Sequence, residues 1–152
     1  MEGKVVSLAV SLKKGTKKTP VEEVYVKEDH GIEGDAHAGA WHRQVSLLAH
    51  ESIKKAQEMG LEVGFGDFAE NIATEGIAWQ TLPIGTKFKV GEVILELTQI
   101  GKECHKRCAI YYMAGDCIMP REGVFAKVLK GGIIKVGDTV QFLSLGDIDR
   151  SE

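Results

Sequence analysis

The chain has 152 residues, of which 43% are hydrophobic and 27% are charged, and its formal net charge is −3. These values are typical of one soluble globular domain and exclude a general nucleic-acid binder, which would normally be basic. No apolar run reaches the roughly 20 residues that span a bilayer, and the short apolar N-terminal stretch lacks the features of a signal peptide. We therefore expect a cytoplasmic protein whose partners include neither nucleic acid nor membrane.

Short apolar runs with partial alternation follow one another along the chain and predict strands. They cover residues 4–11, 22–28, 43–48, 87–90, 93–100, 124–129 and 139–144. A helix is predicted over 50–60, because Ile53, Ala56 and Met59 share one face and Gly60 provides a left-handed stop. A second short helix is predicted over 108–115. The basic stretch LKKGTKKTP, residues 12–20, is interpreted as a solvated loop.

Turns in this chain are expected to depend on glycine, since 18 glycines stand against 3 prolines. Val-Gly-Glu at 90–92 and Val-Gly-Asp at 136–138 are predicted to turn the chain between strands. Many short strands and few helices favour a mainly β fold, namely a closed or nearly closed β-barrel with Gly-rich turns and one or two peripheral helices. We expect one domain over residues 1–145 and a frayed tail over 146–152.

All 3 cysteines lie within GKECHKRCAIYYMAGDC, residues 101–117. They cannot all pair with one another, and a reducing compartment would keep them as thiols. Lys102 and Arg107 lie close to Cys104 and Cys108, and nearby cations lower the pKa of a thiol by favouring the thiolate. Cys104 and Cys108 are therefore candidates for a nucleophilic thiol or a persulfide carrier, with burial as inert packing residues as the alternative. Cys117 lacks basic neighbours and is interpreted as a packing residue.

A metal site in this region would combine Cys104, His105 and Cys108 with His37 or His42 from elsewhere. The Cys-x3-Cys spacing occurs once and matches no common zinc or iron–sulfur pattern. The neighbouring cations would also oppose a bound dication. The sequence therefore favours a thiol site over a metal site.

The stretch HGIEGDAHAGAWHRQVSLL is the second informative segment. Its glycines bracket Asp35, His37 and Arg43 ahead of a predicted strand, a pattern typical of a ligand loop. The planar guanidinium of Arg43 suits a phosphate or a carboxylate. The alternative is a turn in which Asp35 caps backbone amides and the histidines are solvated. Glu70 and Asn71, in GDFAENIATEGI, form an acid–amide pair of a kind that often only satisfies backbone groups.

In their order and spacing these segments resemble the MOSC domain, a family named for the C-terminal region of molybdenum-cofactor sulfurases. The matching pieces are GIEGDAHAG, RQVSLL, GDFAENIATEGI, LPIGTKFKVGEVILELTQ, the cysteine in GKECHKRC, EGVFAKVLKGG and IKVGD. They cover roughly residues 30 to 140. The resemblance implies a β-rich, barrel-like fold, and a protein that carries sulfur on one cysteine and binds or sulfurates metal–pterin cofactors.

The family's cysteine follows a strand that ends in a Thr-Gln-like pair, so Thr98 and Gln99 point to Cys104, with Cys108 as the second candidate. Glu103 stands where many relatives have proline, and a carboxylate there opposes thiolate formation, which leaves the choice between the two cysteines open. By motif position and charge, the expected cofactor-binding residues are Asp35, His37, Arg43, Glu70, Asn71, Lys102 and Arg107.

The resemblance implies a sulfurtransferase-like carrier that accepts sulfane sulfur as a cysteine persulfide and delivers it to the molybdenum cofactor. A cysteine desulfurase would donate the sulfur, and pyridoxal phosphate would belong to that partner because this chain has no room for a fused desulfurase. The acceptor would be a molybdoenzyme or a cofactor-biosynthesis protein. Three alternatives stay open: a non-catalytic module that binds or delivers the cofactor, a reductase of N-hydroxylated substrates that uses bound cofactor, and a thiol-based redox sensor.

Overall fold

The structure is a computed structural model, which describes residues 2–12, 18–60, 62–68, 70–100 and 123–145. Its strands are β1 (Glu2–Val10), β2 (Thr19–Val21), β3 (Glu23–Lys27), β4 (Gly31–Ile32), β5 (Val45–Ala49), β6 (Ile72–Glu75), β7 (Thr86–Val90), β8 (Val93–Ile100), β9 (Val124–Lys130), β10 (Gly132–Lys135) and β11 (Thr139–Leu145). One α-helix, α1 (His50–Glu58), and one 3-10 helix, η1 (Trp79–Thr81), are present in these ranges.

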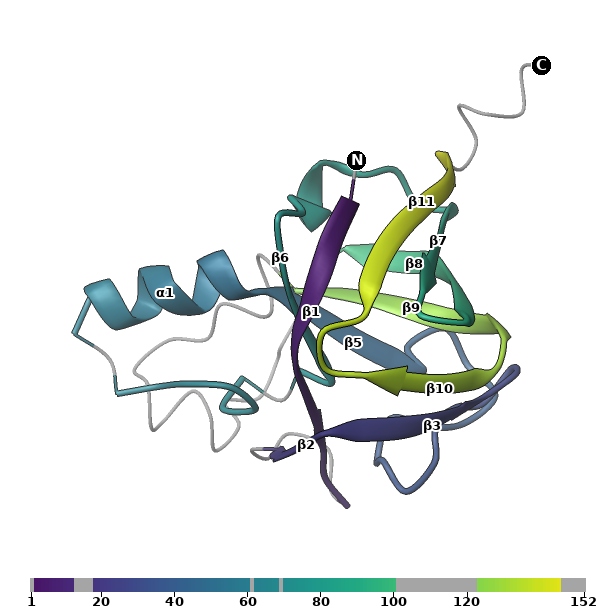
Figure 1. The fold of residues 1–152 in the computed structure, drawn as a ribbon, viewed down its shortest axis with the longest axis horizontal. Coiled ribbons are helices and arrows are strands. Elements are labelled where there is room, and N and C mark those ends of the chain that lie inside the picture. Colours follow the sequence, from purple (N-terminus) through teal and green to yellow (C-terminus); the bar gives the residue numbers. More distant parts are fainter. Residues whose placement is uncertain (1, 13–17, 61, 69, 101–122, 146–152) are drawn as a thin grey trace.

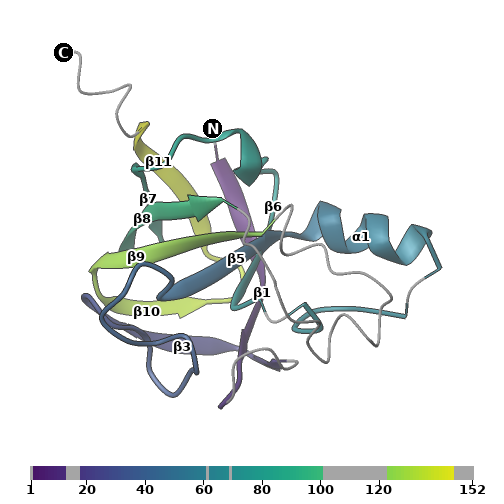
Figure 2. The same cartoon turned by 180° about the vertical axis from the view of Figure 1, so that it is seen from behind.

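Seven strands close a barrel in the order β1, β11, β7, β8, β9, β5 and β6, with β6 pairing back to β1 (Figure 1). Neighbouring strands are antiparallel except β5 and β6, which are parallel and are linked through α1. The strands β10, β3 and β4 form a separate three-stranded sheet. Helix α1 projects from the side of the barrel, as both views show (Figures 1 and 2). The predicted mainly β, closed barrel with a peripheral helix is confirmed.

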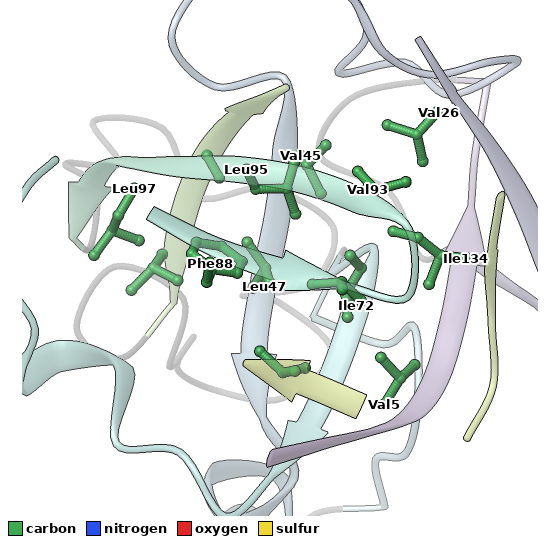
Figure 3. Close-up of a cluster of buried hydrophobic side chains, with 14 of the residues drawn as sticks. Val5, Val26, Val45, Leu47, Ile72, Phe88, Val93, Leu95, Leu97 and Ile134 are labelled. Carbon is green, nitrogen blue, oxygen red and sulfur yellow. The ribbon is translucent and has the colours of Figure 1, made fainter. Parts of the chain in front are cut away.

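The barrel core is filled by side chains that alternate along the strands. On β8 the buried residues Val93, Leu95 and Leu97 alternate with half-buried ones. These side chains meet those of the other strands, such as Leu47 and Phe88, in one apolar cluster (Figure 3). A second, outer cluster includes Leu48 of β5, Phe125 of β9 and residues of α1. The paired strands β5 and β9, called the barrel wall below, are therefore apolar on both faces. The outer face of this wall can support a loop.

The predicted strands correspond to β1, β3, β5, β7, β8, β9 and β11, and the predicted helix corresponds to α1. Gly60, with φ +92°, follows the end of α1 as expected, and the turns at 90–92 and 136–138 are present. The strands that sequence analysis missed, β2, β4, β6 and β10, have only two to four residues, too few for alternation to be visible. The second predicted helix, 108–115, and the predicted frayed tail, 146–152, lie outside the described residues. In the described part of the chain, no helix is long and apolar enough to cross a membrane.

Candidate functional site

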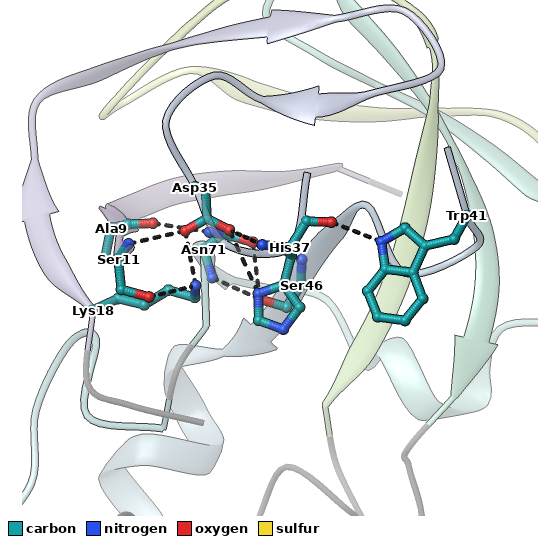
Figure 4. A network of polar contacts seen from close by, with 8 residues as sticks. All are labelled: Ala9, Ser11, Lys18, Asp35, His37, Trp41, Ser46 and Asn71. Atoms are coloured by element: carbon teal, nitrogen blue, oxygen red, sulfur yellow. Dashed lines mark hydrogen bonds and ion pairs between the residues drawn. The ribbon is translucent and has the colours of Figure 1, made fainter. Parts of the chain in front are cut away.

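Asp35 is the centre of a buried polar network beside the outer face of the barrel wall (Figure 4). Its Oδ1 accepts hydrogen bonds from the Ser11 amide, at 2.9 Å, and from Lys18 Nζ, at 2.8 Å. Its Oδ2 accepts one from the His37 amide, at 2.9 Å, and lies 3.5 Å from Nδ1 of His37. Burial favours the neutral acid, but the hydrogen bonds from His37, Lys18 and Ser11 outweigh it and hold the Asp35 pKa well below its usual range. Asp35 is therefore an anion that fixes the loop around it.

Lys18 is a member of this network that sequence analysis missed. The basic stretch around it was expected to be a solvated loop, but the side chains of Lys18 and Asp35 are both 0% exposed. The Lys18 amide donates to the Gly66 carbonyl at 2.8 Å, and its Nζ also donates to Ser11 Oγ at 3.1 Å. Gly66 has φ +85°, and a Cβ there would collide with the Lys18 carbonyl oxygen. Burial of Lys18 thus requires a glycine at position 66 and a carboxylate at position 35.

Arg43 lies close to two aromatic rings next to this network. Its guanidinium carbon is 4.6 Å from the centroid of the Trp41 ring and 5.7 Å from that of Phe125. Trp41 is held in place because its Nε1 donates to the His37 carbonyl at 2.7 Å. Among the described residues, the buried Nε of Arg43 has no hydrogen-bond partner. A guanidinium placed in this way is suited to bind a phosphate or a carboxylate, which would satisfy that N–H group.

His42 attaches the same loop to the ends of two barrel strands. Its Nε2 lies 2.9 Å from Gln99 Oε1, and its carbonyl accepts a hydrogen bond from the Thr98 hydroxyl, which also lies 3.1 Å from the Phe125 carbonyl. The cysteine-bearing segment leaves β8 after Ile100 and rejoins the wall before β9, and residues 100 and 124 are paired in register. The loop that carries Asp35, His37 and Arg43 therefore lies beside both points where this segment joins the barrel.

Four expected site residues, Cys104, Cys108, Lys102 and Arg107, lie outside the described residues. The chemistry that depends on them therefore remains a prediction. In the ranges that the structure describes, no three His, Cys, Asp or Glu side chains are grouped so that they could hold a metal ion.

Asn71 lies wholly buried behind the Asp35 network (Figure 4). Its Oδ1 accepts hydrogen bonds from the Ser46 amide and hydroxyl, both at 3.0 Å, and its Nδ2 donates to the Ala9 carbonyl at 3.0 Å. These bonds join Asn71 to strand residues and tie together β1, β5 and the start of β6. Asn71 thus supports the wall on which the loop rests.

Glu70 is also buried, with 2% of its surface exposed. Its carboxyl group accepts hydrogen bonds from the amides of Gly66, at 2.6 Å, and Phe68, at 3.2 Å. Burial raises the pKa of Glu70 to about 7, although these hydrogen bonds act in the opposite direction. Glu70 shapes the loop whose Gly66 carbonyl holds Lys18, so it supports the Asp35 network from a distance.

The raised pKa of Glu70 leads to a pH-dependent stability. Below the ordinary value of 4.5 both the folded and unfolded states are protonated, whereas between 4.5 and about 7 only the folded state keeps the proton. Stability should therefore fall as the pH rises through this interval. In wild type we expect the free energy of unfolding to fall between about pH 5 and about pH 8. In Glu70→Gln this fall should be smaller by about 2–3 kcal/mol, as measured by urea unfolding. The control is Glu62→Gln, an exposed residue before the same turn. An equal loss in wild type and Glu70→Gln would contradict this assignment.

Taken together, the closed barrel and its outer-wall loop define a small β-barrel domain that presents an arginine and a histidine beside the ends of strands β8 and β9. The sequence matches the profile of the MOSC domain over residues 34–141, and the chain belongs to the MOSC domain family. The expected family is therefore confirmed.

The fold is shared with solved structures of low sequence identity. YuaD from Bacillus subtilis aligns with a TM-score of 0.78 and 18% identity, over 93% of this chain and 96% of that protein. YiiM from Geobacillus stearothermophilus aligns with a TM-score of 0.72 and 19% identity, over 93% of this chain and 75% of that one. YiiM from Escherichia coli gives a TM-score of 0.66 and 20% identity, with coverages of 93% and 70%. At these identities the likeness concerns the fold alone. No significant match is found among curated proteins.

Proposed function

We propose that this protein is a sulfur carrier that binds the molybdenum cofactor and supplies it with sulfur. Membership of the MOSC domain family supports the link to this cofactor. The observation that carries the proposal is the position of Arg43. Its buried Nε lacks a hydrogen-bond partner among the described residues, and it lies in the loop beside the two ends of the cysteine-bearing segment.

The residues of the loop fit the cofactor as a substrate. The molybdenum cofactor is a pterin with a phosphate group, and a guanidinium binds phosphate through paired N–H groups. Arg43 would bind this phosphate, and Lys102 and Arg107 would add positive charge from the cysteine-bearing segment. The rings of Trp41 and Phe125 keep the guanidinium in place, so little conformational freedom is lost on binding.

The cysteines would perform the sulfur chemistry. In the loading step, the Cys104 thiolate attacks the outer sulfur of a persulfide on a pyridoxal-phosphate-dependent cysteine desulfurase, whose own thiolate then leaves. Once the cofactor is bound, Cys108 could attack the inner sulfur of the Cys104 persulfide. This step forms a Cys104–Cys108 disulfide and releases the terminal sulfur as hydrosulfide for the cofactor. An external dithiol would reduce the disulfide, and a molybdoenzyme or a cofactor-biosynthesis protein would receive the product.

Charge reversal at Arg43 should weaken cofactor binding. Arg43→Glu removes the phosphate-binding group and adds repulsion, so we expect the dissociation constant to rise by roughly 10- to 100-fold or more. Equilibrium dialysis with pterin fluorescence would measure this. The control variant is Lys54→Glu, the same charge reversal on an exposed position of α1. Equal affinity of Arg43→Glu and wild type would contradict the proposed binding site.

A non-catalytic binding or delivery module is the main alternative, because the contacts of Arg43 with described residues involve aromatic rings and no cysteine. It would bind the cofactor with the same dependence on Arg43, and a desulfurase would transfer no sulfur to it. Measuring cofactor binding together with sulfur uptake from a desulfurase therefore separates a carrier from a binding module.

A further inference from the structure

Three neighbouring strands carry a cluster of lysines on the outside of the barrel. The strands β7, β8 and β9 are paired in this order and lie away from α1 in both views of the molecule (Figures 1 and 2). The half-buried and exposed lysines of these strands, called the lysine face below, are Lys87, Lys89, Lys127 and Lys130. Within the described ranges, none of the four forms an ion pair. Their charges can therefore interact with a partner.

The pairing of the strands arranges these lysines in two rows across the sheet. In one row Glu96 of β8 is paired with Lys87 on one side and with Lys127 on the other. In the other row Ile94, which is half-buried, lies between the remaining two lysines. Residues directly opposite each other on one face of a sheet have Cβ atoms about 5 Å apart. Four positive charges thus surround a single carboxylate and an apolar side chain.

This composition favours a protein with an acidic surface as the partner of the lysine face. Leu143, which is 52% exposed, precedes the residue paired with Lys87 and adds apolar surface next to Ile94. Protein interfaces combine an apolar centre with a polar rim, and complementary charges orient the two partners as they meet. A nucleic-acid binder would normally be basic overall, whereas this chain has a net charge of −3.

The lysine face begins close to the Arg43 loop. Phe125, whose ring centroid is 5.7 Å from the Arg43 guanidinium carbon, precedes Lys127 by two residues on β9. Side chains two residues apart on a strand point to the same side and are roughly 7 Å apart. A protein bound to the lysine face would therefore lie beside the candidate site.

We propose that the lysine face is the docking surface for an acidic surface of the sulfur donor. The identity of this partner rests on the proposed function. Persulfide exchange requires the sulfur atoms of the two proteins to meet, so the donor has to contact this chain directly. The cofactor, in contrast, is a small molecule that can reach the Arg43 loop by diffusion. The lysines would speed the encounter with the donor and orient it next to this loop.

The first test measures binding of a purified cysteine desulfurase by isothermal titration calorimetry and needs no sulfur transfer. Both residues changed in the double variant Lys89→Glu, Lys130→Glu are exposed, so the fold should persist. We expect its dissociation constant to be roughly 10-fold higher than that of wild type, or more, because two attractive charges become repulsive. Added salt should weaken binding by wild type and change binding by the variant less.

The matched control is Lys54→Glu, Lys55→Glu, which makes the same change of charge on the exposed side of α1. This variant should bind the desulfurase as wild type does. The inference would be overturned by wild-type affinity in Lys89→Glu, Lys130→Glu, by equal weakening in the control, or by a wild-type protein that does not bind the desulfurase.

The same variants test two other anionic partners. Duplex DNA and vesicles that contain phosphatidylserine are titrated with wild type and with Lys89→Glu, Lys130→Glu. We expect neither to bind wild type at physiological salt. Binding of either one that is lost in the double variant, without binding of the desulfurase, would assign the lysine face to that partner and overturn the inference.

Sulfur uptake separates this inference from the proposed function. If both are correct, Lys89→Glu, Lys130→Glu should gain sulfur more slowly than wild type at limiting desulfurase and at the wild-type rate at saturating desulfurase. Equal rates at limiting desulfurase would overturn the inference and leave the proposed function intact. If wild type binds the desulfurase through the lysine face but gains no sulfur, the proposed function fails and the docking surface stands.

Discussion

Cys104→Ala should take up no sulfur from a cysteine desulfurase, whereas wild type and Cys117→Ala should each gain one sulfur atom. The reason is that a sulfane sulfur is carried by a thiolate, and basic side chains close in sequence favour ionisation at position 104. Cys117 lacks such neighbours and serves as the matched control. Intact-mass measurement after incubation with the desulfurase and cysteine would detect the added sulfur, and treatment with a reductant should remove it.

The same measurement decides between the two candidate cysteines. Glu103 opposes ionisation of the thiol at position 104, so Cys108 has to be tested alongside it. Uptake that survives in Cys104→Ala but disappears in Cys108→Ala would make Cys108 the carrier. Uptake that survives in both variants would contradict the proposed chemistry of this segment.

Asp35→Ala should lower the free energy of unfolding by about 3–5 kcal/mol, because it leaves the buried ammonium of Lys18 without its charged partner. Chemical denaturation near neutral pH would measure the change. The double variant Asp35→Ala, Lys18→Met should recover part of the loss, since it removes the buried charge as well.

An exposed ion pair of this protein provides the control for that experiment. Lys27 and Glu33 lie 3.5 Å apart, with 62% and 50% of their side chains exposed. Glu33→Ala should therefore cost less than about 1 kcal/mol, because water screens the pair. If Asp35→Ala proved no more destabilising than Glu33→Ala, the Lys18–Asp35 contact would not support the site as described.

Much of the barrel could be predicted because strands such as β7 and β8 alternate between buried and more exposed residues. β8, for example, has the bounds that sequence analysis expected, residues 93–100. β6 could not be predicted in the same way, because its four residues, Ile72–Glu75, are mostly buried. It forms by parallel pairing to β5 and antiparallel pairing to β1, which are contacts between distant parts of the chain. Closure of the barrel therefore depends on contacts between distant segments, which local sequence patterns do not reveal.

Residues of the candidate site could be predicted where they lie close together in the sequence. Asp35, His37 and Arg43 belong to one glycine-rich loop, and that local pattern indicated a ligand loop. Lys18 carries no such signal, because its burial depends on a carboxylate 17 positions away and on the backbone of Gly66. Trp41, which packs on Arg43 and bonds to the His37 carbonyl, was also missed. An aromatic residue two positions before the arginine was the available signal.

Sequence analysis gave two interpretations of Asn71, and the structure bears on one of them. Its motif position implied a pocket-lining residue, and the simpler alternative was an amide that satisfies backbone groups. The structure gives Asn71 bonds to Ser46 and to the Ala9 carbonyl, which match the simpler alternative. Glu70 likewise binds the amides of its own loop. A role for either residue in binding the cofactor stays a prediction.

A labelled sulfur atom can be followed all the way from the protein to the cofactor. Wild-type protein is first loaded with isotopically labelled sulfur by a desulfurase, and is then mixed with molybdenum cofactor in the absence of any added reductant, which would itself remove the sulfur. The label should leave the protein and appear on the cofactor in wild type, and this transfer should be lost in Arg43→Glu but kept in Lys54→Glu. Label that stays on the protein, or that leaves it equally in wild type and Arg43→Glu, would contradict a sulfur-delivery site at the Arg43 loop.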